Sequence, residues 1–422
     1  MTRNMKDSGI EWIGQIPEDW NLVKVKDAFI RKNSKANAKD PVILSLARDG
    51  VKIRDISNNE GQLASDYSNY NPVKINDLLL NPMDLVSGDN CNIAKVEGVI
   101  SPAYFNLRYK DGVNPELYNF YFKNLYWGNV FFAHGKGVSF ENRWTLNYET
   151  LSHMMIPLPS ISEQNKIADF LIKKSNKLES IKFTILKEIK TLEDYKKSLI
   201  KEAVTKGLDK NVEMKDSGIE WIGEIPKHWE LIKGKYILKL LKKPVKASDE
   251  VITCFRDGEV TLRSKRREEG FTFADKEIGY QGIDVGDLVV HGMDGFAGAI
   301  GISDSRGKGS PVLNVLDSIC DKRYLMFYLR AMSYSDVFSA LATGIRVRSV
   351  DLRWNKLANL PYPLPSKDEQ NKIANFIENA LYKTDSLIST KQKQLEILEE
   401  YKKSLIYEYV TGKKEVEDVG TI

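Results

Sequence analysis

Basic and aromatic side chains gather in a few short stretches of this chain, and their chemistry is that of anion and nucleic-acid binding. FFAHGKGVSFENRWTLNY begins at Phe131, RSKRREE begins at Arg263, and ATGIRVRSVDLRWNKL begins at Ala342. Glycine beside lysine or arginine lets the backbone approach a phosphate, and an arginine fork can reach a guanine edge through two donors. The alternative is that these residues are solvated charges on exposed loops.

A repeated Arg-Asp-Gly tripeptide adds further basic positions. It occurs at residues 48–50 and 256–258, and alternating residues follow it each time, which predicts a turn and then a strand. Together with the stretches above it gives the candidate DNA-contacting set: Arg48, Lys52, Arg54, His134, Lys136, Arg143, Arg256, Arg263, Lys265, Arg266, Arg267, Arg346 and Arg348.

The sequence lacks the usual patterns of catalysis and cofactor binding. It has no G-x-x-x-x-G-K-[ST] phosphate loop, no G-x-G-x-x-G and no H-E-x-x-H. The histidines lie far apart, without a carboxylate or cysteine partner at ligand spacing. Cys91, Cys254 and Cys320 are scattered, which suits a reducing compartment and predicts neither a zinc site nor a disulfide framework. We therefore expect no metal, no bound cofactor and no catalysis in this chain.

Length and composition set mild limits. A chain of 422 residues is too long for one core, so several domains are expected. A formal net charge of +4 is too small to indicate a nucleic-acid partner, so only local clustering can do so. No apolar run approaches the roughly 18 residues of a membrane span, and the N-terminus lacks a secretory signal. These features predict a cytoplasmic protein.

Two motifs are written twice. MKDSGIEWIGQIPEDW at 5–20 returns as MKDSGIEWIGEIPKHW at 214–229, with thirteen of sixteen positions identical. PLPSISEQNKIADFL from Pro157 returns as PLPSKDEQNKIANFI from Pro363, and each copy leads, after the same number of residues, to LEDYKKSLIKEAVT or LEEYKKSLIYEYVT. The chain is therefore interpreted as a duplication, in which a variable block and a long segment occur twice.

The long segments are predicted to be helices of about 45 residues, roughly 68 Å long. Ser160 with Glu163, and Ser366 with Glu369, match the capping-box pattern, while Gly207 and Gly412 mark the ends. Apolar residues recur at heptad spacing, which favours an antiparallel intramolecular coiled coil over a coiled coil between chains. The predicted coiled-coil positions are Leu171, Leu178, Ile185, Leu192, Leu199, Ile377, Leu381, Ile388, Leu395 and Leu405.

The variable blocks share framework pieces, so we expect them to share a fold. The runs DLLL from Asp77 and DLVV from Asp287 predict a buried strand in each block, and an aromatic-rich helix follows each. The predicted class is α+β, with two α/β domains separated by the paired helices in a pseudo-twofold arrangement. The expected segments are 1–157 (first domain), 158–208 (first long helix), 209–362 (second domain), 363–412 (second long helix) and 413–422 (C-terminal tail).

The repeated motifs resemble the specificity subunit of type I restriction-modification systems. The resemblance rests on the twice-written DSGIEWIG opening, the PLPS..EQNKIA.F stretch and the YKKSLI ending, and it covers nearly the whole chain. It implies a non-catalytic, DNA-reading subunit with two target recognition domains. It also implies two methylation subunits carrying S-adenosylmethionine, and two motor-nuclease subunits using ATP and magnesium in the restriction complex.

This family role gives the duplication a physical meaning. Each domain would read one half of a split, asymmetric site in double-stranded DNA, and the helices would set the unread spacer. Identical openings would dock each domain on the same kind of helix end, through Trp12, Trp20, Trp221 and Trp229. Two alternatives remain: a two-headed regulatory or structural DNA-binding protein without a methylation partner, and a self-sufficient fused enzyme, for which the motifs are missing.

Overall fold

The computed structural model describes residues 3–37, 41–47, 50–56, 66–85, 90–137, 144–266, 277–335, 337–340 and 352–417. Contacts divide the chain into two compact units. Unit 1 comprises Met1–Ile185 with Lys393–Ile422, and unit 2 comprises Leu186–Gln392. Each unit therefore contains part of both long helices.

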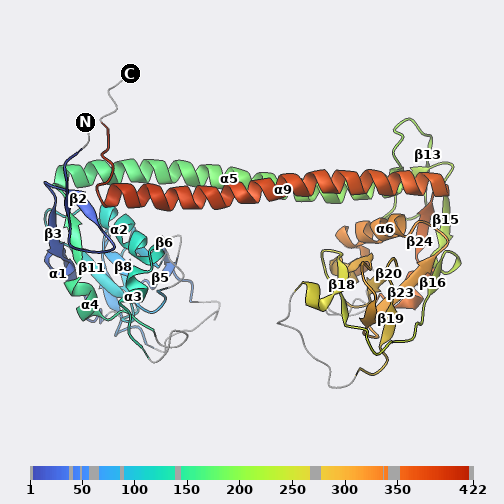
Figure 1. Cartoon of the computed structure of the whole chain (residues 1–422), viewed down its shortest axis with the longest axis horizontal. Helices are drawn as coiled ribbons and strands as arrows, with labels where there is room; N and C mark the ends of the chain where they lie inside the picture. The colour runs from blue at the N-terminus through green and yellow to red at the C-terminus, as the bar shows by residue number, and fades with distance from the viewer. Residues whose placement is uncertain are drawn as a thin grey trace. The chain divides into compact units, whose positions relative to one another are not determined.

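Unit 1 mixes short strands with helices (Figure 1). Its strands are β1 (Met5–Asp7), β2 (Gln15–Pro17), β3 (Asn21–Lys24), β4 (Phe29–Arg31), β5 (Leu44–Ala47), β6 (Gly50–Ile53), β7 (Asn71–Val73), β8 (Leu78–Leu80), β9 (Cys91–Ile93), β10 (Gly98–Ile100), β11 (Phe105–Tyr109) and β12 (Met155–Leu158). Its helices are α1 (Val25–Ala28), α2 (Pro115–Trp127), α3 (Val130–Ala133), α4 (Tyr148–His153) and the first part of α5 (Ile161–Lys206).

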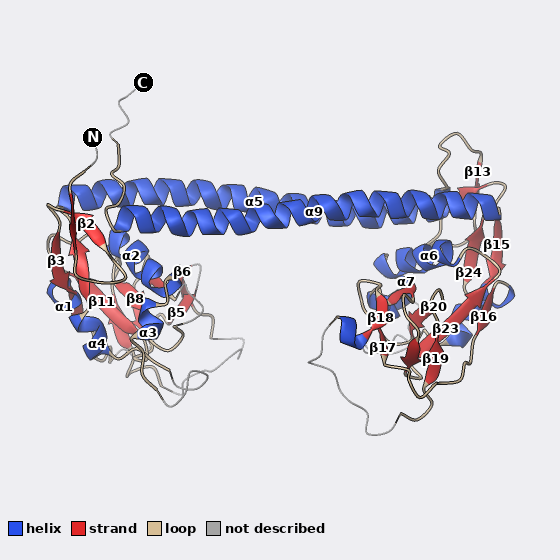
Figure 2. Cartoon of the chain, viewed as in Figure 1, coloured by secondary structure: helices blue, strands red, loops and turns tan. Residues whose placement is uncertain are grey.

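Unit 2 has the same kinds of elements in the same order (Figure 2). Its strands are β13 (Met214–Asp216), β14 (Glu224–Pro226), β15 (Glu230–Lys233), β16 (Leu238–Leu240), β17 (Ile252–Cys254), β18 (Val260–Leu262), β19 (Gln281–Ile283), β20 (Leu288–His291), β21 (Ile300–Ile302), β22 (Gly307–Gly309), β23 (Leu313–Ser318) and β24 (Pro361–Leu364). Its helices are α6 (Lys322–Tyr334), α7 (Val337–Ala340), α8 (Trp354–Asn359), the first part of α9 (Lys367–Val410) and the 3-10 turns η1 (Gly234–Tyr236), η2 (Arg263–Lys265) and η3 (Gly295–Ala297).

Strand pairing follows one plan in both units. The main sheet has the order β4-β11-β8-β9 in unit 1 and β16-β23-β20-β21 in unit 2. The smaller antiparallel pairs also correspond: β1-β2 with β13-β14, β5-β6 with β17-β18, β10-β7 with β19-β22, and β12-β3 with β15-β24. The predicted α+β class is therefore confirmed.

One inner strand of each main sheet, β8 in unit 1 and β20 in unit 2, is buried on both faces. Leu78 and Leu80 of β8 face the core that α2 covers, whereas Leu79 between them belongs to a second core with residues of β5, β7 and β10. Because side chains alternate across a sheet, an unbroken apolar run is what a doubly covered strand requires. In unit 2, Leu288 and Val290 face one core and Val289 faces the other.

An aromatic helix fills the space between the main sheet and the long helices in each unit. In unit 1 this is α2, capped by the Asn114 side chain, which accepts from the backbone N–H groups of Glu116 and Leu117. In unit 2 it is α6, capped by Asp321. Tyr324 of α6 donates to the carbonyl of Val204 on α5 at 3.2 Å. In each unit the aromatic helix thus packs between the main sheet and the long helices.

Helices α5 and α9 contain 46 and 44 residues, which confirms the two long helices predicted from the heptad pattern. Within unit 1, Glu179 pairs with Lys402 at 2.6 Å and Lys182 pairs with Glu399. Within unit 2, Glu188 pairs with Lys391 at 2.5 Å and Lys196 pairs with Asp385. In each unit the partner number falls as the α5 number rises, so the two helices run antiparallel there.

The predicted coiled-coil positions fall on the covered side of these helices. Leu171, Leu178, Ile185, Ile377 and Leu405 are buried. The others are partly buried: Leu192, Leu199, Leu381, Ile388 and Leu395. The ion pairs flank this apolar stripe, so the seam combines an apolar centre with charged margins.

Candidate nucleic-acid interface

The β5-β6 hairpin of unit 1 and the β17-β18 hairpin of unit 2 hold their basic residues in matching register. The backbone N–H of Arg54 donates to the carbonyl of Ile43, and that of Arg263 donates to the carbonyl of Val251, both at 2.8 Å. Each arginine therefore follows the second strand of its hairpin at the same point. The Arg263 side chain also bonds Thr253 through Nε at 3.4 Å.

In unit 2 the basic residues of the hairpin face carboxylates. Arg256 Nη2 lies 2.9 Å from Asp294 Oδ1. Arg266 donates from Nη1 to Asp257 Oδ1 at 3.0 Å and to Glu259 Oε2 at 2.9 Å, and its guanidinium lies 4.0 Å from the centre of the Phe255 ring. The hydrogen bonds to Asp257 raise the pKa of Arg266.

The basic stretch that begins at Arg263 therefore lies beside acidic side chains. Lys265 Nζ is 2.7 Å from Ser305 Oγ and 3.5 Å from Asp304 Oδ2, so a third cation of the hairpin has an acidic neighbour. Sequence reasoning found the cations and missed the carboxylates, because Asp294 and Asp304 lie far along the chain. A phosphate would have to compete with these ion pairs, which fix the direction of the cations.

The unit 1 candidates occupy varied environments. Lys52 is exposed on β6. His134 lies against the edge of Trp12, with ring centroids 4.9 Å apart, and its Nδ1 is 2.8 Å from the carbonyl of Val130. Lys136 is exposed, and its backbone forms a two-way bridge with Thr145. This bridge fixes the backbone of Lys136 against Thr145, whereas the His134 ring packs on Trp12.

Five candidates lie outside the described residues: Arg48, Arg143, Arg267, Arg346 and Arg348. Their role in DNA contact stays a prediction from sequence.

Trp20 sits where the start of α5 meets the end of α9 in unit 1. It is 1% exposed, and its Nε1 donates to Glu163 Oε2 at 3.0 Å. A Cβ placed on Gly412, which ends α9 with φ +72°, would come within 2.9 Å of the Trp20 ring. Ser160 Oγ does accept from the Glu163 N–H at 3.3 Å, as a capping box requires, but the Glu163 carboxylate serves Trp20 and Arg3.

Trp229 forms the corresponding junction in unit 2, between the start of α9 and the end of α5. It is 0% exposed, and its Nε1 donates to Glu369 Oε1 at 3.1 Å. A Cβ on Gly207, with φ +74°, would lie 3.2 Å from its ring. One glycine after each long helix therefore gives both the left-handed turn and the room for a tryptophan.

A difference between the two repeats is explained at these junctions. Asp19 in the first copy is replaced by His228 in the second. In unit 1, Arg3 bridges Asp19 at 2.8 Å and Glu163 at 2.5 Å. In unit 2, His228 Nε2 reaches Glu369 directly at 3.0 Å. Each copy thus supplies a nitrogen donor to the glutamate, from a different residue.

The glutamine of the repeated EQNK motif joins each long helix to its aromatic helix. Gln164 Oε1 accepts from the N–H of Asn114 at 2.8 Å, and Gln370 Oε1 accepts from the N–H of Asp321 at 2.9 Å. Asn114 and Asp321 are the caps of α2 and α6. Sequence reasoning missed this role, although the repetition of the motif was the signal for it.

The other two tryptophans of the repeated opening also reach the cores. Trp12 packs on the unit 1 core and Trp221 on the unit 2 core, each partly buried. Trp221 lines a small cavity with Lys201 and Thr205 of α5.

The described ranges contain neither a metal-binding cluster nor a membrane-spanning helix. Within them, no group of three or more His, Cys, Asp or Glu side chains is arranged to hold a metal ion. None of the helices there combines the length and the apolar character that a membrane span needs.

Known proteins resemble this chain over almost its full length. The type I restriction enzyme MjaVIII specificity subunit of Methanocaldococcus jannaschii is 24% identical over 434 aligned positions, which cover 96% of this chain and 95% of that protein. No protein-family model matches the sequence. Over nearly its whole length, the chain is therefore similar to type I restriction enzyme specificity subunits.

Solved structures show that the fold is shared. A chain from a structure of a type I R-M system superposes on this chain with a TM-score of 0.71, at 12% identity, covering 94% of this chain and 99% of that one. The HsdS subunit from Thermoanaerobacter tengcongensis gives a TM-score of 0.50 at 12% identity, covering 94% and 98%. A fold kept at such low identity leaves surface residues free to differ.

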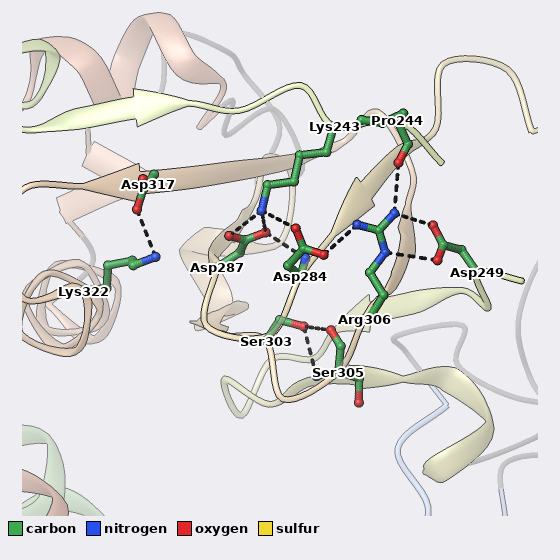
Figure 3. A network of polar contacts seen from close by, with 10 residues as sticks. All are labelled: Lys243, Pro244, Asp249, Asp284, Asp287, Ser303, Ser305, Arg306, Asp317 and Lys322. Atoms are coloured by element: carbon green, nitrogen blue, oxygen red, sulfur yellow. Dashed lines mark hydrogen bonds and ion pairs between the residues drawn. The ribbon is translucent and has the colours of Figure 1, made fainter. Parts of the chain in front are cut away.

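A polar network holds together three loops of unit 2 (Figure 3). Lys243 Nζ contacts Asp284 Oδ2 and Asp287 Oδ2, both at 2.7 Å. Arg306 contacts Asp284 at 2.6 Å and Asp249 at 2.7 Å. Hydrogen bonds from Lys243 and then Arg306 lower the pKa of Asp284 from its ordinary 3.8 to about 2.

This shift predicts a pH-dependent contribution of Asp284 to stability. A carboxylate whose pKa is lowered by folding stabilises the protein fully above its unfolded pKa, and loses that effect as pH falls through the folded pKa. We expect Asp284→Asn to lower the unfolding midpoint of unit 2 by about 1–4 °C at pH 7. The difference from the parent should hold down to about pH 4 and shrink below it.

The measurement is differential scanning calorimetry of both proteins between pH 3 and 7. Asp169→Asn, at an exposed position of α5, is the control and should change little at any pH. A gap between parent and Asp284→Asn that widens as the pH falls would contradict the prediction.

Proposed function

We propose that this chain is a type I specificity subunit that reads a bipartite, asymmetric site in double-stranded DNA, one half-site per unit. The proposal takes residues 1–157 and 209–362 as duplicated target recognition domains, and 158–208 and 363–412 as the paired helices that set the unread spacer; 413–422 is the tail. The observation that carries it is the pairing plan of the strands, which is the same in both units while the charged side chains on matching hairpins differ.

The matching hairpins illustrate how one scaffold would read two sequences. In strand register, Lys52 of β6 corresponds to Thr261 of β18, because Lys52 pairs with Ser45 and Thr261 pairs with Thr253. A cation in one copy thus stands where a neutral hydroxyl stands in the other. Phosphate contacts would fix register, and side chains on these edges would read bases.

The proposed complex contains two methylation subunits carrying S-adenosylmethionine, with two motor-nuclease subunits using ATP and magnesium for cleavage. Similarity to specificity subunits and to a chain of a solved type I R-M structure supports such an assembly. A target adenine in each half-site would be flipped into a methylation subunit, whose pocket performs the chemistry. This chain's own part is to bind DNA and to position the partners.

Deleting the gene and sequencing the host methylome tests this function. We expect N6-methyladenine to disappear from one bipartite motif and to return when the gene is restored. That motif gives both half-sites and the spacer in one experiment. If every methylated motif persisted in a host that expresses the partner subunits, the reading as a two-headed regulatory or structural DNA-binding protein would replace the proposal.

A further inference from the structure

Arg31, at the end of β4, is held between two aromatic rings. Its guanidinium carbon lies 4.9 Å from the ring centre of Phe105 and 4.7 Å from that of Tyr148. Phe105 begins β11, the neighbour of β4 in the main sheet, and Tyr148 begins α4. The two rings also contact each other edge-to-face, with centroids 5.6 Å apart, so contacts from two different elements fix the position of this guanidinium.

The interaction partners of the Arg31 side chain differ from those of several other arginines. Within the described ranges, its side chain donates to no carboxylate, carbonyl or hydroxyl group; the two ring contacts are its interactions. Other arginines in these ranges are paired with carboxylates: Arg3, Arg108, Arg256, Arg266, Arg306 and Arg323. Arg31 is therefore placed by stacking alone, which leaves its planar set of five donors open to a ligand.

Arg31 also lies beside the basic and aromatic stretch predicted to contact DNA. Tyr148 is the last residue of the stretch that begins at Phe131. The same stretch is tied to the end of the main sheet, because the N–H of Leu146 donates to the carbonyl of Pro82 at 2.9 Å. The fold thus brings an arginine of β4 into contact with Tyr148, the last residue of this stretch.

Unit 2 has different residues at the three corresponding places. Strand register matches Arg31 with Leu240, since Arg31 pairs with Leu107 and Leu240 with Leu316. Phe105 pairs with Leu80, and Asn314 pairs with Val290, so Phe105 matches Asn314. Trp354, the first residue of α8, takes the place of Tyr148. The stacked arginine therefore belongs to one copy of the fold.

We propose that Arg31 contacts the DNA of the half-site read by unit 1, presenting two coplanar N–H donors to a pair of acceptors. The acceptors are either the O6 and N7 atoms of a guanine or two oxygens of a phosphate. Stacking limits the freedom of the side chain beforehand, so little entropy is lost when the donors engage. This inference rests on the proposed function, and it adds a contact residue for one half-site only.

The test uses the full chain in its host, with the methylome as one readout and binding of the assembled complex to motif DNA as the other. Arg31→Ala and Arg31→Met remove the donors, and methionine retains an apolar stem between the rings. We expect both to weaken binding by about 5- to 150-fold. Leu240→Ala, at the matching register of unit 2, is the control and should leave the unit 1 half-site unchanged.

Arg31→Lys distinguishes a guanine edge from a phosphate as the group that accepts from Arg31. With a guanine edge, lysine should fail to restore the parent motif, and one guanine position of one half-site should become degenerate. With a phosphate, lysine should restore binding, the motif should stay intact, and the alanine variant should lose about 0.9 from its salt slope. Unchanged affinity, salt slope and motif in Arg31→Ala would overturn the inference. A parent that shows no motif at all would instead refute the proposed function.

Discussion

Replacing Trp20 by alanine should cost unit 1 about 3–5 kcal/mol of unfolding free energy, the usual range for removing a fully buried tryptophan. The ring fills the junction between the start of α5 and the end of α9, at 1% exposure, and it lies so close to Gly412 that a Cβ there would come within 2.9 Å of it. Truncation would open a cavity there, and it would also remove the indole donor from Glu163.

The chain contains its own matched comparison at Trp229. This residue makes the same contacts with Glu369 and Gly207 in unit 2, so Trp229→Ala should destabilise unit 2 by a similar amount. Phenylalanine at either position keeps most of the apolar volume and removes the N–H donor. We therefore expect Trp20→Phe and Trp229→Phe to cost about 1.5–3 kcal/mol, the range for a hydrogen bond to a charged group.

Hydrogen–deuterium exchange of the full chain measures each unit separately, because local opening reports the free energy of each cooperative region. Trp20→Ala should speed exchange in β3, β12 and α2, and leave β15, β24 and α6 as in the parent. Equal acceleration of both units by either single substitution would contradict the assignment of each tryptophan to one junction.

These junctions also show what a sequence can and cannot predict. The heptad pattern and the terminal glycines predicted the long helices, and the apolar runs predicted a buried strand in each domain, because these features depend on local patterns. The partner of Trp20 was not predictable. Glu163 lies 143 positions away, and its spacing from Ser160 suggested a local cap instead.

The predicted DNA-contacting set shows the same limit. The run that begins at Arg263 is visible as a cluster of charge, but its acidic neighbours lie outside the run: Asp257 and Glu259 earlier in the same hairpin, and Asp304 about 40 positions along the chain. Arg31 was missed for the opposite reason. It stands alone in its strand, and only tertiary packing places it between Phe105 and Tyr148.

Lengthening both long helices by one heptad should change the spacing of the methylated motif without changing its half-sites. The duplicated segments would be residues 181–187 in α5 and 386–392 in α9, which keeps the apolar stripe in phase. These insertion points leave the ion pairs within each unit intact, including Glu188 with Lys391 and Lys182 with Glu399. Seven residues add about 10 Å of helix, or about three base pairs of B-DNA.

Methylome sequencing of a host that carries the double insertion checks this expectation. The parent motif should lose its N6-methyladenine, and the same two half-sites should appear with about three more unread base pairs between them. A single insertion, in α5 alone, is the control; it shifts the stripe of one helix past the other, so we expect loss of methylation at both spacings. If the double insertion kept the parent spacing, α5 and α9 would not be the element that sets it, and the spacer would have to be fixed by the partner subunits.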